Sequence, residues 1–320
     1  MSVPRRPLGL SDLQVSPVGF GCWPIAGVSS LGVTEADSLA TLEAALECGI
    51  NFFDTAYAYG YAGEADRLLA RAVVPQRNRV VIASKVGQYF DAGRNRVVDG
   101  RPETLLRHSR EVLDRLGTDA VDIMYLHQPD PAVPIGESAG AIAEVVARKW
   151  ARYAGVSNVD AGQLEEFVRH CPATVVVQPP FNMLQQSALE QLRPGIRRHR
   201  LGVACYWVLM KGLLAGKLQR DHRFDPRDKR LTYPIFQGEM WQRAQDLLDR
   251  LRRMAAELEC TTAQLVVAWT LAQPDVTVAL CGAKRPEQIR ESAAAMHLEL
   301  PAEGRQRIEE WVQEFRGYFE

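Results

Sequence analysis

The chain has 320 residues, 47% of them hydrophobic and 24% charged, so it can bury a large core and is neither disordered nor of low complexity. Its 38 Lys and Arg residues nearly balance its 39 Asp and Glu residues, which gives a net charge of -1. No block of like charge is long enough to create the extended positive field with which a protein binds nucleic acid.

Short apolar runs rich in β-forming residues recur along the chain and predict eight strands. In chain order they are Val18–Gly21, Ile50–Asp54, Val80–Lys85, Val121–His127, Tyr153–Val156, Thr174–Gln178, Gly202–Tyr206 and Val276–Cys281. The segments between them carry apolar residues at helical spacing and helix-capping signals, such as Thr34 before the stripe of Leu39, Leu42 and Leu46. Strands and helices are therefore expected to alternate.

The predicted strands are almost continuously apolar, which is typical of parallel strands covered on both faces. A doubly wound sheet would carry Gly-x-Gly-x-x-Gly after its first strand, but here Gly19–Trp23 is followed by Pro24. No repeat or linker divides the chain. We therefore predict a single α/β domain over residues 1–320, folded as a (β/α)8 TIM barrel.

Two longer excursions, 86–101 and 219–237, have little apolar periodicity. Both begin near the C-terminal ends of predicted strands, where barrel enzymes carry their substrate loops. We expect these two segments to shape the substrate pocket.

The cysteines are scattered and form no Cys-x-x-Cys or His-x-x-x-His pattern, which predicts reduced thiols and no metal site. They are Cys22, Cys48, Cys171, Cys205, Cys260 and Cys281. The opening residues lack the apolar segment of a signal peptide, and the longest charge-free stretch, 13–34, contains prolines and glycines that a membrane helix disfavours. We expect a cytoplasmic protein with neither a membrane nor a nucleic-acid partner.

Polar residues close most of the predicted strands and would face one common site if the barrel forms. They are Asp54, Lys85, His127, Ser157, Asn158, Gln178 and Tyr206, with Tyr59 in the loop after Asp54. Any one of them could be an ordinary strand-end or core residue. Their joint placement at one barrel mouth favours a catalytic site.

Four of these residues suit the reduction of a carbonyl group, in which a proton donor must face the developing alkoxide. A tyrosine is a reluctant acid, but a neighbouring lysine ammonium is expected to lower its pKa, so Lys85 would activate Tyr59. Asp54 would hold the lysine in its charged form. His127 would donate a hydrogen bond to the same substrate oxygen.

Five motifs, in order, resemble those of the aldo-keto reductase superfamily. They are D-T-A-Y-A-Y-G from Asp54, I-A-S-K ending at Lys85, Y-L-H-Q-P-D-P from Tyr125, G-V-S-N from Gly155 and V-Q-P-P-F-N from Val177. The resemblance covers nearly the whole chain and implies a barrel that binds NADP(H) across its mouth. It also implies a catalytic tetrad of Asp54, Tyr59, Lys85 and His127. Tyr57 is the alternative acid, but the family places Gly after the catalytic tyrosine, as Gly60 follows Tyr59 here.

The same resemblance implies the residues that bind the cofactor. At the nicotinamide they are Ser157, Asn158 and Gln178, with Asp54 beside them, the stacking ring of Tyr206 with its neighbour Trp207, and Gly21, Cys22 and Trp23 beneath. Over the pyrophosphate lies the run from Leu209 through Lys211 and Gly212 to Lys217. At the adenosine end are Gly282, Lys284 and Arg285, with the two basic residues for the 2′-phosphate, and Gln288, Glu291 and Ser292 for adenine.

Three positions depart from the family pattern: Trp207 after the stacking tyrosine, Gln128 after the histidine, and Ser292 where Asn is usual. They bear on the substrate rather than on the reaction class. The expected activity is NADP(H)-dependent reduction of aldehydes or ketones to alcohols. The alternatives are an aldose 1-dehydrogenase that oxidises a sugar, and a cofactor-sensing binding subunit without catalytic function. The expected partner in the first two cases is a small carbonyl or sugar molecule.

Overall fold

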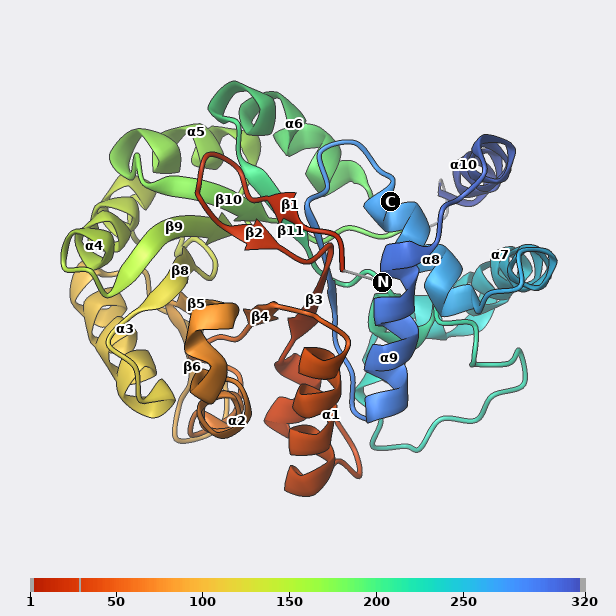
Figure 1. The fold of residues 1–320 in the computed structure, drawn as a ribbon, viewed down its shortest axis with the longest axis horizontal. Helices are drawn as coiled ribbons and strands as arrows, with labels where there is room; N and C mark the ends of the chain where they lie inside the picture. Colours follow the sequence, from red (N-terminus) through yellow and green to blue (C-terminus); the bar gives the residue numbers. More distant parts are fainter. Residues whose placement is uncertain (1–2, 29, 317–320) are drawn as a thin grey trace.

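The computed structural model describes residues 3–28 and 30–316 and contains a closed barrel of eight parallel strands (Figure 1). The order of the strands around the barrel is β10-β11-β12-β3-β4-β5-β8-β9. Their bounds are β3 Val18–Gly21, β4 Phe52–Asp54, β5 Val81–Val86, β8 Val121–Leu126, β9 Ala151–Ser157, β10 Thr174–Gln178, β11 Gly202–Cys205 and β12 Val278–Cys281. Each predicted strand is confirmed, so the (β/α)8 prediction holds.

Helices alternate with these strands and surround the barrel (Figure 1). Their bounds are α1 Glu35–Glu47, α2 Glu64–Ala72, α3 Pro102–Leu116, α4 Ile135–Ala147, α5 Ala161–His170, α6 Ser187–His199, α7 Gly238–Glu257, α8 Thr262–Leu271, α9 Pro286–Ala294 and α10 Ala302–Arg316. Short 3-10 turns are η1 Trp23–Ala26, η2 Val74–Arg79, η3 Met210–Gly212, η4 Lys229–Thr232, η5 Pro234–Phe236 and η6 Ala295–His297. The helices α7 and α10 pack on each other at the periphery. None of the helices within the described residues is both long and apolar enough to cross a bilayer.

Local sequence signals fix where several helices begin. Thr34 accepts a hydrogen bond from the backbone N–H of Asp37, and the Asp37 carboxylate accepts one from the N–H of Thr34, so α1 starts with a reciprocal capping box. Asp160 and Thr261 start α5 and α8 in the same way. These three capping boxes therefore fix the first residues of α1, α5 and α8.

The closing of the barrel joins distant parts of the chain, because β12 pairs in parallel with β3. A short antiparallel pair, β1 Arg6–Pro7 and β2 Gln14–Val15, lies beside the barrel interior, with Leu8, Leu13 and Val15 packed among inward-facing residues of the strands. Gly9 has a φ of +56° and a Cβ there would lie 2.2 Å from the carbonyl oxygen of Val175. Only glycine allows this close approach.

The two expected excursions have local structure. The first, after β5, forms the hairpin of β6 Gln88–Phe90 and β7 Arg96–Val98. The second lies between β11 and α7 and contains η4 and η5. Both segments therefore follow strands whose C-terminal ends carry the predicted site.

Candidate active site

Asp54, Lys85 and Tyr59 form one cluster at the C-terminal ends of β4 and β5, in which Asp54 and Lys85 are buried and Tyr59 is half-buried. The Lys85 ammonium donates to Asp54 Oδ2 at 2.5 Å, to the Thr55 carbonyl oxygen at 3.0 Å and to the Tyr59 hydroxyl at 3.1 Å. The side chains of Lys85 and Asp54 are only 1% and 2% exposed. The parallel pairing of β4 with β5 brings the two strand ends together. The Lys85–Asp54 pair is therefore shielded from bulk water, and its ammonium reaches the hydroxyl of the half-buried Tyr59.

Burial raises the pKa of Tyr59 above its usual value, although the charge of Lys85 acts in the opposite direction. The prediction that Lys85 gives Tyr59 a lowered pKa is therefore wrong for the net shift, because the loss of water outweighs the ammonium. Burial alone would lower the pKa of Lys85, but Asp54 and Tyr59 raise it overall. At neutral pH the cluster holds a protonated phenol beside a charged amine.

Tyr57, the alternative acid, points to a different set of partners. Its hydroxyl donates to Glu111 Oε2 at 2.5 Å, and its ring stacks on His108 with centroids 3.8 Å apart. The Arg115 guanidinium lies 4.0 Å from the same ring. Tyr57 thus packs against α3, whereas Tyr59 faces Lys85.

His127 follows β8 directly, and its backbone N–H donates to the Val86 carbonyl oxygen at 2.9 Å. Its ring lies edge-on to the Tyr59 ring, with centroids 6.0 Å apart. Burial and the positive charges of Lys85 and Arg96 hold the pKa of His127 well below its usual value. The imidazole is therefore neutral at physiological pH. Among the described residues Nδ1 has no hydrogen-bond partner.

The predicted nicotinamide residues lie beside this cluster and are bonded to it. Gln178 donates through Nε2 to Asp54 Oδ1 at 2.8 Å, and the Ser157 hydroxyl donates to the Gln178 carbonyl oxygen at 2.8 Å. Asn158 donates through Nδ2 to the His127 carbonyl oxygen at 2.9 Å and accepts from the Tyr206 hydroxyl at 2.7 Å. These bonds connect the ends of five strands into one surface, on which Tyr206 presents an aromatic ring.

The residues after β3 occupy the other side of Tyr59. The backbone N–H of Cys22 donates to the Asp54 carbonyl oxygen at 2.9 Å, and the buried Cys22 side chain packs in the core. The Trp23 indole meets the Tyr59 ring edge-on, with centroids 5.3 Å apart. Gly21 lies beside the Gly282 backbone at the β3–β12 pair. Trp23 therefore contacts the cluster of Asp54, Lys85 and Tyr59 through Tyr59.

Trp207 lies just past β11 in a positive-φ conformation, with φ of +62°. Its ring meets the Tyr206 ring edge-on at 5.5 Å and the Tyr233 ring at 6.3 Å. The Lys211 ammonium lies 4.6 Å from the Trp207 ring and 4.4 Å from the Tyr233 ring. Trp207 is half-buried, and it joins the loop after β11 to the 219–237 excursion.

Basic residues gather at the N-terminus of α9. The Lys284 ammonium is half-buried, and burial together with the nearby charges of Arg230 and Arg285 lowers its pKa. Asp228 is the carboxylate in this group, and Arg230 already holds it in an ion pair of 2.6 Å. A cluster with more cations than carboxylates fits an anionic ligand such as phosphate.

The Arg285 side chain is held by residues at the start of α1. Its guanidinium forms an ion pair with Asp37 and donates to the Gly32 carbonyl oxygen at 3.1 Å. These partners lie before α1 and in its first turn. Arg285 is thus bound to α1, whereas Lys284 faces Arg230.

The remaining predicted cofactor residues lie around the same helix start. The Gln288 side chain accepts from the Lys284 backbone N–H at 2.7 Å, and Lys217 pairs with Glu291 at 2.6 Å. Ser292 is buried beside Cys281. Leu209 and Gly212 lie in the turn after β11, where Gly212 has a φ of +90°. The predicted adenosine-end residues are therefore close to one another in the fold.

The sequence does not single out Arg230, which the structure places near Lys284. It comes from η4, and its Nη1 is 3.8 Å from where a Cβ on Gly212 would lie. It therefore approaches both the loop after β11 and Lys284. In the sequence, Arg230 ends a run of mixed charge, D-P-R-D-K-R, inside the 219–237 excursion. Nothing in this run distinguishes Arg230 from its charged neighbours.

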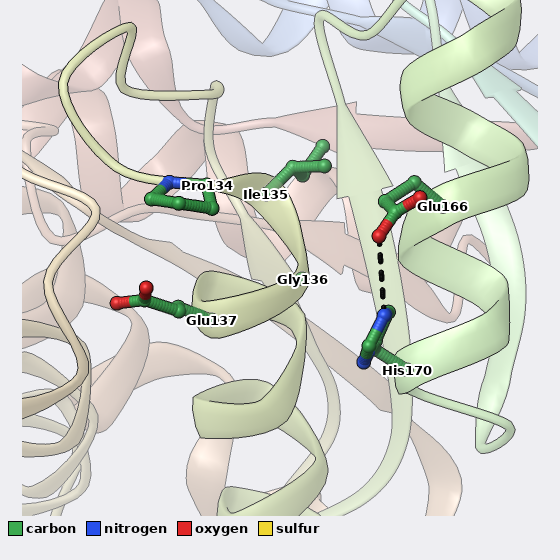
Figure 2. A pocket seen from close by; sticks show the side chains of 6 residues that line it. All are labelled: Pro134, Ile135, Gly136, Glu137, Glu166 and His170. Atoms are coloured by element: carbon green, nitrogen blue, oxygen red, sulfur yellow. Dashed lines mark ion pairs between the residues drawn. The ribbon is translucent and has the colours of Figure 1, made fainter.

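A pocket between α4 and α5 lies apart from these residues (Figure 2). It is lined by Pro134, Ile135, Gly136, Glu137, Glu166 and His170. His170 pairs with Glu166 at 3.1 Å, and no predicted site residue lines the pocket. Across residues 3–28 and 30–316 no group of three or more His, Cys, Asp and Glu side chains is arranged to hold a metal ion.

The chain belongs to the aldo/keto reductase family, whose family model matches residues 17–313. The barrel with its Asp-Lys-Tyr-His cluster is thus that of an oxidoreductase family whose members act on small carbonyl compounds.

Three known proteins show the range of its relatives. The chain is 30% identical to an NADH-specific methylglyoxal reductase of Escherichia coli (strain K12), over 92% of this chain and 94% of that protein. It is 31% identical to a probable voltage-gated potassium channel subunit beta of Arabidopsis thaliana, over 90% of each. The solved glycerol dehydrogenase of Gluconobacter oxydans superposes with a TM-score of 0.89 at 28% identity, covering 98% of this chain and 97% of that chain.

Proposed function

We propose that this protein is an NADP(H)-dependent reductase of aldehydes or ketones, with Tyr59 as the general acid and the whole chain, 1–320, forming one barrel domain. The observation that carries the proposal is the Lys85 ammonium, which lies between the Asp54 carboxylate and the Tyr59 hydroxyl in a buried cluster.

The four residues have separate tasks in the proposed reaction. Tyr59 donates its phenolic proton to the carbonyl oxygen as negative charge develops there. Lys85 stabilises the resulting phenolate, and Asp54 keeps Lys85 charged where water is excluded. His127, neutral because of its low pKa, orients the substrate oxygen through a ring N–H.

The chain offers a site of the right chemistry for a nicotinamide cofactor. When bound, the cofactor supplies or accepts the hydride. Ser157, Asn158 and Gln178 would bind its carboxamide, and Tyr206 would pack against its ring. Lys284 and Arg230 would bind its phosphates, since their charges are only partly balanced by Asp228. The 2′-phosphate would lie at Lys284.

Two other functions, a dehydrogenase and a cofactor-sensing binding subunit, also have specific support. The glycerol dehydrogenase neighbour favours activity in the oxidative direction on a polyol or sugar. The β-subunit relative favours a cofactor-sensing binding role. Neither requires a change in the tetrad, so the geometry alone does not separate them from the reductase.

Initial rates decide between these readings. The purified protein is assayed with NADPH or NADH plus short aldehydes, and with NADP+ or NAD+ plus glycerol and aldoses. Faster turnover with NADPH and aldehyde supports the proposal. Faster turnover with the oxidised cofactor and a sugar supports the dehydrogenase. Absence of turnover in every combination, with NADPH still bound in a fluorescence titration, supports the binding subunit.

A further inference from the structure

The hairpin β6–β7 places an arginine beside the catalytic cluster. Arg96 lies on β7, directly across from Phe90 in the antiparallel register. Its guanidinium carbon is 5.5 Å from the Trp23 ring and 5.7 Å from the Phe90 ring. Since the Trp23 ring is itself 5.3 Å from the Tyr59 ring, Trp23 contacts both Arg96 and the proposed acid.

The hairpin is held in place at both ends, so the position of Arg96 is defined. At its base the Asp99 N–H donates to the Gly87 carbonyl oxygen at 2.9 Å. At its tip the Asp91 carboxylate accepts from the backbone N–H of Asn95 at 2.8 Å. On its inner side Gln88 donates to Gln128, the neighbour of His127, at 2.6 Å.

The charge of Arg96 is not neutralised within the described part of the chain. Among the described residues no acidic side chain forms an ion pair with Arg96, and Asp91, the acid on its own hairpin, is bonded to Asn95. The side chain is exposed, stacks on aromatic rings and leaves its N–H groups accessible. Its positive charge still acts on the candidate active site, because it is one of the causes that lower the pKa of His127. The guanidinium is the group that best binds a carboxylate or phosphate through two parallel hydrogen bonds.

We propose that Arg96 determines substrate specificity by binding an anionic group, a carboxylate or a phosphate, that a short chain connects to the reacting carbonyl. This inference rests on the proposed function and narrows its substrate class to anionic aldehydes and ketones. Trp23 forms the wall between the two ends of the substrate, with the carbonyl at Tyr59 and the anion at Arg96.

The decisive experiment uses two aldehydes of the same shape, 4-carboxybenzaldehyde and 4-methylbenzaldehyde. In the wild type, kcat/KM should favour the carboxylate. In Arg96→Gln, kcat/KM for the carboxylate should fall about tenfold or more while that for the methyl compound changes less than about twofold, since one charged hydrogen-bonding group is lost. Arg96→Lys should retain part of the preference.

Arg94→Gln is the matched control. Arg94 lies on the same hairpin but packs over Tyr61, with 4.6 Å from its guanidinium carbon to the ring, so its loss should leave the ratio of the two aldehydes unchanged. An unchanged ratio in Arg96→Gln, or an equal change in Arg94→Gln, overturns the proposal. The wild-type preference should also weaken as salt is raised, as expected of a solvent-accessible ion pair.

A carboxylate and a phosphate are told apart by a second pair of aldehydes, glyceraldehyde and glyceraldehyde 3-phosphate, assayed in the same variants. A second readout keeps the two proposals separate. Calorimetry on the cofactor-loaded protein compares 4-(hydroxymethyl)benzoate with 4-methylbenzyl alcohol. If no aldehyde is turned over, the reductase proposal fails, but binding of the benzoate that Arg96→Gln weakens selectively still supports the anion site. Equal binding in the two proteins contradicts it.

Discussion

Lys85 and Lys284 both serve the proposed reaction, yet the fold treats their charges in opposite ways. The Lys85 ammonium is 1% exposed and contacts the Asp54 carboxylate, so its pKa is raised. The Lys284 ammonium lies among Arg230 and Arg285, and its pKa is lowered by burial and by their charges. A charge that acts on every turnover is compensated within the protein. A charge that is meant to bind a ligand is only partly compensated by the protein, and the negative charge of the ligand supplies the rest.

The largest effect is expected at the cluster around Lys85, whose charge is compensated by Asp54. Tyr59→Phe removes the proposed proton donor while leaving Lys85 and Asp54 paired, so kcat should fall by about 10²- to 10⁴-fold. The Kd for NADPH should stay near its wild-type value. Tyr57→Phe is the matched control and should be comparatively mild, because the Tyr57 hydroxyl bonds Glu111 instead. If kcat were unchanged in Tyr59→Phe for every active substrate, Tyr59 would not be the general acid.

A second prediction concerns stability behind the same cluster. Asp66 is fully buried, accepts from the Thr55 hydroxyl at 2.7 Å, and has a pKa raised to about 7. Because this pKa exceeds its unfolded value, the stabilising contribution of the protonated form is full below about pH 4 and is lost as the pH rises through about 7.

Asp66→Asn removes this dependence, so the variant should gain on the wild type as the pH rises. Between pH 5 and pH 8 the difference in the free energy of unfolding should move in its favour by on the order of 2 to 3 kcal/mol. Urea unfolding at the two pH values measures it. Asp114→Asn, at an exposed position on α3, should show no such trend. If the free energies of unfolding of Asp66→Asn and the wild type changed in parallel with pH, the pKa of Asp66 would not be raised, and the prediction would be wrong.

Lys284→Ala tests the proposed phosphate site, where the positive charge is only partly compensated. The 2′-phosphate is absent from NADH, so the variant should bind NADPH about one to two decades more weakly and NADH almost unchanged. Arg285→Ala is the matched control, because Arg285 pairs with Asp37 and should matter little for either cofactor. Fluorescence titrations with both cofactors measure this. Equal losses for NADPH and NADH in Lys284→Ala would mean that the helix start was damaged or that the phosphate site lies elsewhere.

The smallest effect is expected at Trp207, which joins the two ends of the site. If its indole borders the substrate, Trp207→Ser should raise kcat/KM for bulky aldehydes relative to slender ones by a few fold. A panel of small, aromatic and bulky aldehydes provides the measurement. Equal ratios across the panel would show that the indole only holds Lys211 and Tyr233 in their loops.

Much of the fold, and the grouping of the candidate site residues, could be predicted because they depend on local signals. Apolar runs specify the strands, and the residue that ends each parallel strand must lie at one rim of the barrel, which brings Asp54, Lys85 and His127 together. The net pKa shift of Tyr59 was not predictable, because it depends on how deeply the whole cluster is buried. Arg96, Arg230 and the partner of Arg285 were missed or left open for a similar reason. Their neighbours come from distant loops, so sequence spacing does not reveal them.

The pairing of β3 with β12 also affects how the protein is made. The partner of Val18 is Ala279, so the first barrel strand cannot complete its hydrogen bonds until more than four-fifths of the polypeptide has left the ribosome. Until then both edges of the growing sheet are open and rich in apolar side chains, which are the features that lead to aggregation. Nascent chains shorter than about 281 residues should therefore depend most on chaperones.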